Sequence, residues 1–170
     1  KRNNLDKDFI IIGQGIAGSV LSLSLIKAGY SVTVINQPTL SSSSKVAGGI
    51  WNPIVFKRLT KSWMADELVP ELISFYEYWE QQFNTSLICK RKIIKPFTEE
   101  QEKNLWVKKS LDKDIENVFL DKETYENYQL DENYQVKSYS KVLQAGNLDV
   151  PKFLECTKEY IKQSHTYLEE

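Results

Sequence analysis

Residues that bind metals or take part in redox chemistry are scarce in this sequence. Histidine occurs once, as His165, and cysteine occurs twice, as Cys89 and Cys156. The cysteines are far apart and form no C-x-x-C pair, so we expect two reduced, structural thiols rather than a disulfide, a metal site or a redox centre. His165 lies in a polar stretch near the C-terminus, where a surface position is expected rather than a catalytic one.

An excess of charge of one sign and a long apolar run are also missing. The 170 residues contain 22 Lys and Arg against 23 Asp and Glu, which gives a net charge of -1. Nucleic-acid-binding domains are usually strongly basic, so a nucleic-acid partner is not expected. No stretch reaches the roughly twenty apolar residues of a membrane span, and the apolar run 9–12 is too short for a signal-peptide core. We therefore expect no membrane segment and a cytoplasmic location.

Three glycines follow that apolar run, in the stretch FIIIGQGIAG at residues 9–18. Their spacing matches the G-x-G-x-x-G turn of dinucleotide-binding proteins. In such a turn Gly13 permits the tight change from strand to helix, Gly15 lets backbone N–H groups approach a pyrophosphate, and Gly18 lets the helix pack closely on the strand. The pyrophosphate charge then lies at a helix N-terminus.

The segments on each side of the glycines strengthen this prediction. Residues 9–12 form an apolar run without alternation, as expected for a strand buried on both faces of a parallel sheet. The apolar residues between 20 and 26 predict a helix that ends at Ala28-Gly29 with a glycine cap. A short β-branched strand follows at 31–35. The sequence therefore predicts a βαβ unit over residues 8–36.

The residue at the end of the second strand, where an acid usually binds the adenosine ribose, is Asn36. A carboxylate accepts hydrogen bonds from both ribose hydroxyls, whereas an amide offers one acceptor oxygen and one donor group, so we expect weaker adenosine binding. No arginine that could hold a 2′-phosphate occurs in residues 37–40, which disfavours NADP.

A second motif follows at residues 41–53, where four serines lead through Lys-Val-Ala-Gly-Gly into Ile-Trp-Asn-Pro. A flexible serine linker would explain the hydroxyl residues alone, but not the small and bulky residues that follow them. Serine hydroxyls beside the ribose end could bond phosphate oxygens. The Ala-Gly-Gly stretch has no side chains that would obstruct a flat ring lying against the backbone.

These two motifs, in this order, resemble the D-amino-acid oxidase family of FAD-dependent oxidoreductases, which includes glycine oxidase and sarcosine oxidase. Residues 143–149 look like the family's later strand, glycine turn and Leu-Asp entry to a helix. Residues 51–59 also resemble the oxidase domain of the bacterial enzyme that trims the 5-aminomethyl group of tRNA wobble uridines. That similarity leaves a modified tRNA as a minor alternative to a small-molecule substrate.

The resemblance implies FAD as the cofactor and gives each candidate residue a role. The glycine turn would hold the pyrophosphate, Asn36 would meet the adenosine ribose, and the serines would meet phosphate or ribitol. The segment 48–50 would run beside the flavin ring, where backbone N–H groups stabilise the charge of a reduced flavin. The candidate cofactor residues are Gly13, Gly15, Ile16, Ala17, Gly18, Asn36, Gln37, Ser43, Ser44, Gly48, Gly49 and Ile50.

Later segments predict an α/β fold in which a Rossmann-like FAD-binding sheet carries an inserted, mixed or antiparallel β substrate subdomain. We expect the first part of the FAD-binding domain at 1–84, the insert at 85–142 and the return to the FAD-binding domain at 143–170. A helix is expected from Glu67, with Leu68, Leu72, Phe75, Trp79 and Phe83 on its buried face. A strand at 87–97, a charged helix at 99–110, a strand at 138–143 and a turn at Gly146 should follow. The last expected element is a helix that begins at Asp149 and buries Phe153, Leu154, Thr157 and Ile161.

Two further groups of residues are expected to lie on the surface or to pack in the fold rather than to bind a ligand. The basic cluster Lys90-Arg91-Lys92 usually indicates a solvated face, with an acidic substrate or RNA as the alternative. Four tyrosines, which are Tyr125, Tyr128, Tyr134 and Tyr139, are expected to pack on a sheet face rather than to contact substrate.

Together these features predict an FAD-dependent oxidoreductase that oxidises the C–N bond of a small amine or amino acid, with hydride transfer to flavin N5. Family members are considerably longer, so we expect the 170 residues to be an incomplete, inactive part that lacks the catalytic residues. One alternative is a flavin-free remnant or interaction module that keeps the fold, which Asn36 favours. A second is an NAD-binding enzyme, which the serine motif disfavours. The sequence predicts neither the substrate, the electron acceptor nor the oligomeric state.

Overall fold

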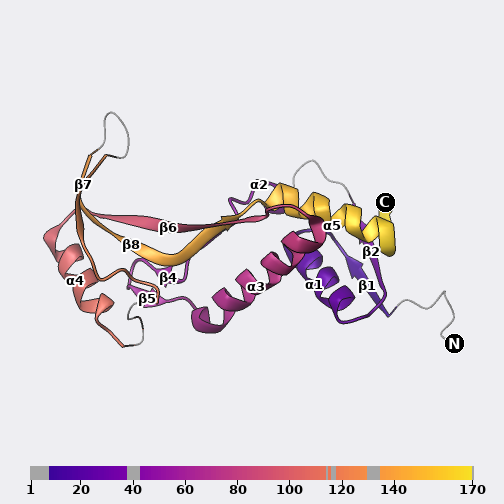
Figure 1. Cartoon of the computed structure of the whole chain (residues 1–170), viewed down its shortest axis with the longest axis horizontal. Coiled ribbons are helices and arrows are strands. Elements are labelled where there is room, and N and C mark those ends of the chain that lie inside the picture. The colour runs from indigo at the N-terminus through magenta and orange to yellow at the C-terminus, as the bar shows by residue number, and fades with distance from the viewer. Residues whose placement is uncertain (1–7, 38–42, 114, 116–117, 130–134, 170) are drawn as a thin grey trace. The chain divides into compact units, whose positions relative to one another are not determined.

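The structure is a computed structural model that describes residues 8–37, 43–113, 115, 118–129 and 135–169 (Figure 1). Its contacts divide the chain into two units. The first unit comprises residues 1–49, 79–87 and 148–170, and the second comprises residues 50–78 and 88–147. The domain bounds expected from the sequence stay a prediction. Among the described residues, no helix is both long and apolar enough to cross a membrane.

The first unit is built on a three-stranded parallel sheet with the strand order β1-β2-β9. Its strands are β1 (Phe9–Ile12), β2 (Val32–Asn36) and β9 (Thr166–Glu169), and its helices are α1 (Ile16–Lys27), the short α2 (Ser43–Val46) and α5 (Val150–Ser164). Ile11 pairs with Val34, and Val34 pairs with Tyr167. The predicted βαβ unit is confirmed as β1, α1 and β2 in parallel register.

The predicted ends of two helices are also confirmed. Gly29, just past α1, has a φ of +87° and donates its N–H to the Ile26 carbonyl at 2.9 Å. At the start of α5, the Asp149 side chain accepts the Lys152 N–H at 3.1 Å. The buried side of α5 consists of the four predicted residues together with Val150.

The helices α1 and α5 pack on one face of the sheet. Ile161 of α5 forms a core cluster with Ile11, Val32 and Val34, and Leu25 and Ile26 of α1 pack against it. Because side chains alternate along a strand, the neighbours of Ile11 point to the opposite face.

Those neighbours are exposed, so the expectation that residues 9–12 are buried on both faces is wrong for the described part of the chain. Ile10 is 66% exposed and Ile12 is 84% exposed. The physical reason is that β1 lies at the end of the described sheet and that α1 and α5 cover a single face.

The described part of the second unit contains two sheets, one in the order β3-β8-β6 with β7 paired to β8, and one of the two strands β4 and β5. Its strands are β3 (Ile50–Trp51), β4 (Ile54–Val55), β5 (Thr60–Lys61), β6 (Ile88–Phe97), β7 (Tyr125–Gln129) and β8 (Gln135–Leu148), and its helices are α3 (Ala65–Phe83), which continues into the first unit, and α4 (Glu100–Ser110). The predicted strand at 87–97 and helix at 99–110 are confirmed. The core includes the fully buried Trp106 of α4 with Phe119, Leu120 and Val142.

The helix α3 forms where the sequence predicts it, but its buried face is displaced at the N-terminal end. Trp79 is buried, as predicted, whereas Leu68 is 46% exposed and Val69 and Tyr76 are buried. The predicted stripe is wrong at its first position because Val69 and Tyr76, which are also apolar and helically spaced, provide the inner face instead.

The turn predicted at Gly146 is wrong, because Gly146 lies inside β8 and pairs with Trp51 of β3. A Cβ atom at Gly146 would lie 2.3 Å from Trp51 Cη2 and 2.4 Å from the Cys89 carbonyl oxygen. Glycine is needed here for close packing rather than for a change of chain direction.

The tyrosines Tyr125 and Tyr139 stack across β7 and β8 with ring centroids 5.2 Å apart, as expected for packing on a sheet face. Tyr128 contacts the same Tyr139 ring. Tyr134 lies outside the described residues.

A pair of neighbouring substitutions tests which face of β1 is buried. Ile11→Ala should lower the free energy of unfolding by roughly 2–5 kcal/mol, because it leaves a cavity in the core, whereas Ile12→Thr should change it by less than about 0.5 kcal/mol. Urea denaturation of both variants measures the difference. Equal losses would show that the Ile12 face is buried too.

Candidate functional site

The glycine turn joins the end of β1 to the first turn of α1. Gly13 has a φ of +90°, a backbone conformation that side chains disfavour, and donates its N–H to the Ile35 carbonyl at 2.8 Å. The first helical hydrogen bond runs from the Ser19 N–H to the Gly15 carbonyl at 2.9 Å. The chain therefore changes from strand to helix within the G-x-G segment, as predicted.

Gly18 brings the helix against the turn. A Cβ atom at this position would lie 2.0 Å from the Gly13 carbonyl oxygen and 3.2 Å from its carbon. Because both neighbours are backbone atoms, no side-chain movement could make room for it. Close packing of helix on strand, the role predicted for Gly18, is thus a geometric requirement.

Ser44 of the second motif lies at the N-terminus of α1. Its Oγ accepts the Ile16 N–H at 3.1 Å, although the two residues are 28 positions apart. A Cβ atom at Gly15 would approach this Oγ to 2.8 Å. The structure therefore brings the glycine motif and the serine motif together at one helix end.

This helix end is suited to an anion. The N–H groups of a first turn have no carbonyl four residues earlier, and the helix dipole adds partial positive charge. The first turn of α1 contains no acidic residue, and Gly15 provides no side-chain cap. A bound phosphate would therefore meet donors at Ala17 and Gly18, and at Ile16 if the Ser44 hydroxyl moves away from the Ile16 N–H.

Gln14, between the first two glycines, ties the turn to its surroundings and was missed by the sequence analysis. Its Nε2 donates to the Leu154 carbonyl of α5 at 2.7 Å, and its Oε1 accepts the Tyr167 hydroxyl of β9 at 2.9 Å. Burial raises the pKa of Tyr167, which keeps the phenol protonated as a donor. Nothing in the sequence signals this role, since the motif leaves the position open.

Asn36, at the end of β2, is half-buried beside the same turn. Its Oδ1 accepts the Gln14 backbone N–H at 2.9 Å. The Asn36 side chain also hydrogen-bonds Tyr167, so its amide is engaged with the protein, while its oxygen keeps a second lone pair for a ligand.

The segment 48–50 lies beside the start of α5. Gly49 has a φ of +64°, its carbonyl accepts the Leu148 N–H at 2.9 Å, and a Cβ atom on it would lie 2.1 Å from the Leu148 carbonyl oxygen. Gly48 is exposed, and Ile50 is 71% exposed and pairs with Asn147 in the second unit. Gly48 and Ile50 are thus exposed, whereas the Gly49 carbonyl is already bonded to Leu148.

Other candidate residues are not brought to the turn. Gln37 and Ser43 are exposed, and no hydrogen bond among the described residues joins Gln37, Ser43 or Gly48 to the glycine turn. Ser41 and Ser42 lie outside the described residues. The site's centre is therefore Gly13 to Gly18 with Asn36 and Ser44, and these residues fit the pyrophosphate and ribose of a dinucleotide.

Comparison with protein families shows to which family of dinucleotide-binding proteins the chain belongs. The model of the FAD dependent oxidoreductase family matches residues 8–165. The chain belongs to the FAD dependent oxidoreductase family. The α/β architecture is the fold of this family, whose members depend on FAD. No match was found among curated proteins.

Several solved structures with the same fold are named as oxidases or deaminases of amines or amino acids. The chain is similar to glycine oxidase from Bacillus cereus ATCC 14579, with a TM-score of 0.66, 17% identity and coverage of 96% of this chain and 46% of that one. It is also similar to iminodiacetate oxidase from Chelativorans sp. BNC1, with a TM-score of 0.69, 12% identity and coverage of 95% of this chain and 46% of that one. A third similar structure is L-amino acid deaminase from Proteus vulgaris, with a TM-score of 0.66, 15% identity and coverage of 99% of this chain and 41% of that one. The chain thus spans less than half the length of these family structures.

Removal of the Ser44 hydroxyl tests the contact between the two motifs. Ser44→Ala should lower the free energy of unfolding by about 1 kcal/mol, because the Ile16 N–H loses its acceptor at the start of α1. Ser43→Ala, at the exposed neighbouring position, is the matched control and should have little effect. Thermal or urea denaturation measures both variants, and equal stability of the two would contradict the contact.

Proposed function

We propose that this chain is the FAD-binding part of an oxidoreductase that oxidises the C–N bond of a small amine or amino acid. The observation that carries the proposal is the meeting of the glycine turn with Ser44 at the N-terminus of α1, in a chain of the FAD dependent oxidoreductase family. The names of the similar structures, which are oxidases or deaminases of glycine, iminodiacetate and L-amino acids, support an amine or amino acid as the substrate class.

The residues of the first unit have separate tasks in this proposal. The backbone N–H groups at Ile16, Ala17 and Gly18 bind the pyrophosphate, and the Ser44 hydroxyl turns from the Ile16 N–H to a phosphate oxygen. Asn36 and Gln37 meet the adenosine ribose, Ser43 adds a hydroxyl for phosphate or ribitol, and the segment 48–50 lies beside the ring. The bound flavin supplies the acceptor for a hydride at N5.

A flavin-free interaction module is the second candidate, and the hydrogen bond of Asn36 favours it. The Asn36 Oδ1 already accepts the Gln14 N–H, so it has one lone pair left for a ribose hydroxyl, whereas a carboxylate would offer a second oxygen. Under this alternative, the turn is retained because it holds α1, β2 and α5 together. Binding of nucleotide by the chain separates the two candidates.

Titration with ADP and with FAD tests the proposed site, because ADP contains the groups that the first unit would hold. Gly15→Val should abolish measurable binding of both ligands. Gly15 has a φ of -86° and a ψ of -168°, which valine adopts readily, and the added Cβ would displace only the Ser44 Oγ, a movable side-chain atom at 2.8 Å. The valine should therefore block the pyrophosphate position without preventing the fold. Calorimetry with ADP and quenching of flavin fluorescence with FAD measure the affinities.

The matched control is Ala28→Val, which adds side-chain volume at the exposed, opposite end of α1. It should bind both ligands as the unmodified chain does. Equal affinities of Gly15→Val and Ala28→Val would show that the site is wrongly assigned. An unmodified chain that binds neither ligand would favour the flavin-free candidate.

A second substitution tests the ribose position. Asn36→Asp should keep or improve FAD and ADP binding, because one carboxylate oxygen can accept the Gln14 N–H while the other accepts a ribose hydroxyl. Asn36→Leu should weaken binding, because it removes both functions. The same titrations measure the change, and weaker binding by Asn36→Asp would exclude contact between this side chain and the ribose hydroxyls.

A further inference from the structure

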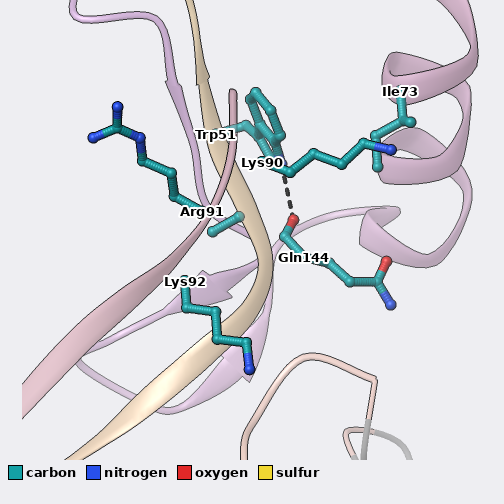
Figure 2. A pocket seen from close by; sticks show the side chains of 7 residues that line it. Trp51, Ile73, Lys90, Arg91, Lys92 and Gln144 are labelled. Atoms are coloured by element: carbon teal, nitrogen blue, oxygen red, sulfur yellow. Dashed lines mark hydrogen bonds between the residues drawn. The ribbon is translucent and has the colours of Figure 1, made fainter. Parts of the chain in front are cut away.

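The second unit contains a pocket of about 440 Å³ whose lining shares no residue with the candidate cofactor site. It is lined by Trp51, Ile73, Lys90, Arg91, Lys92 and Gln144, together with the buried Ala145 (Figure 2). These residues come from β3, α3, β6 and β8. Apolar side chains and cationic side chains therefore meet in one hollow.

The indole of Trp51 is a fixed wall of this pocket. Its Nε1–H donates to the Gln144 carbonyl at 2.8 Å, the bond drawn in Figure 2. The ring packs so closely on Gly146 that a Cβ atom there would lie 2.3 Å from it. Gln144 has a φ of +53°, an uncommon conformation for a residue with a side chain, and its own amide donates to the Val118 carbonyl at 3.1 Å. The wall is thus held by a strained backbone, as often occurs at binding sites.

The cationic side of the pocket comes from β6. Successive side chains alternate along a strand, and Figure 2 shows Arg91 pointing away from the directions that Lys90 and Lys92 take. Lys90 forms an ion pair with Glu77 at 2.5 Å, and Arg91 contacts the Cys89 sulfur at 3.2 Å. Within the described part of the chain, no carboxylate lies within ion-pair distance of Lys92, and none lines the pocket.

A row of lysines on a strand usually faces solvent without further purpose, as the sequence analysis expected. Two observations distinguish this row. The lysines border a hollow rather than a flat surface, and the same hollow has an aromatic wall and an aliphatic floor. An ammonium group beside an apolar surface suits a ligand with an anionic end and an apolar body.

We propose that this pocket binds a small organic anion. The carboxylate or phosphate of the ligand bonds to Lys92, with Lys90 beside it, and its apolar part lies against Trp51, Ile73 and Ala145. The identification of this ligand as the substrate rests on the proposed function. If the ligand is the substrate, it is an amine or amino acid that carries an acidic group on an apolar body.

Three small probes test the pocket without FAD: phenylacetate, phenyl phosphate and the uncharged phenylacetamide. The readout is the ¹H–¹⁵N signal of the Trp51 indole in the 170-residue chain, assigned by its loss in Trp51→Phe. Phenylacetate or phenyl phosphate should shift this signal saturably, and phenylacetamide should bind at least about tenfold more weakly, because it cannot form a charge-assisted bond. Whichever anion binds more tightly identifies the carboxylate or the phosphate as the group recognised.

Matched variants then assign the cation. Lys92→Gln should raise the Kd of the tighter anion about tenfold, and Lys92→Arg should restore most of the affinity. Lys108→Gln removes the same charge from an exposed position of α4 that does not line the pocket, so its Kd should change less than about twofold. Unchanged thermal denaturation of each variant confirms that it is folded.

Three results would overturn the proposal: no saturable shift of the Trp51 signal with either anion, equal binding of phenylacetamide, or equal effects of Lys92→Gln and Lys108→Gln. Failure of the proposed function is distinguishable from these results. A chain that binds neither ADP nor FAD yet binds phenylacetate at Lys92 would lose its assignment as a flavin-binding part and keep its anion pocket.

Discussion

The first unit depends on the approach of Gly18 to the Gly13 carbonyl oxygen, which leaves no room for a side chain. This contact fixes where the axis of α1 starts relative to the end of β1. The first-turn N–H groups then emerge beside the end of β2, where Asn36 reaches the Gln14 N–H, and within reach of the Ser44 hydroxyl. With a larger residue at Gly18, the helix would move outward and these two bonds would be lost together.

The parts of the fold that local signals determine could be predicted from the sequence. The turn glycines, the glycine after α1 and the Asp149 cap act within a few residues, and the structure confirms each of them. The strand β9 was missed, because the four residues Thr166–Glu169 carry no strong pattern and become a strand by pairing with β2. The burial of β1 was predicted wrongly for a related reason, since an apolar run does not tell which of its faces a helix covers.

The candidate site shows the same division. Motif spacing identified the glycines and Ser44, but it could not identify Gln14, whose bonds to Leu154 and Tyr167 join positions more than 130 residues apart in the sequence. Gly146 illustrates the opposite error. A glycine that permits a turn and a glycine that admits a neighbouring ring look identical in a sequence, and only the position of Trp51 tells them apart.

Asn36 shows how the demands of folding and binding combine at one side chain. An amide has one acceptor oxygen, and the Gln14 N–H takes one of its two lone pairs, so the turn is held by the group that a dinucleotide protein usually offers to ribose. One lone pair remains for a ribose hydroxyl, and the Asn36 side chain also hydrogen-bonds Tyr167. The turn therefore keeps its shape without a carboxylate, while the adenosine end loses acceptors. Because the pyrophosphate site at Ile16 to Gly18 is independent of this exchange, nucleotide affinity in this chain should depend more on the phosphates than on the ribose.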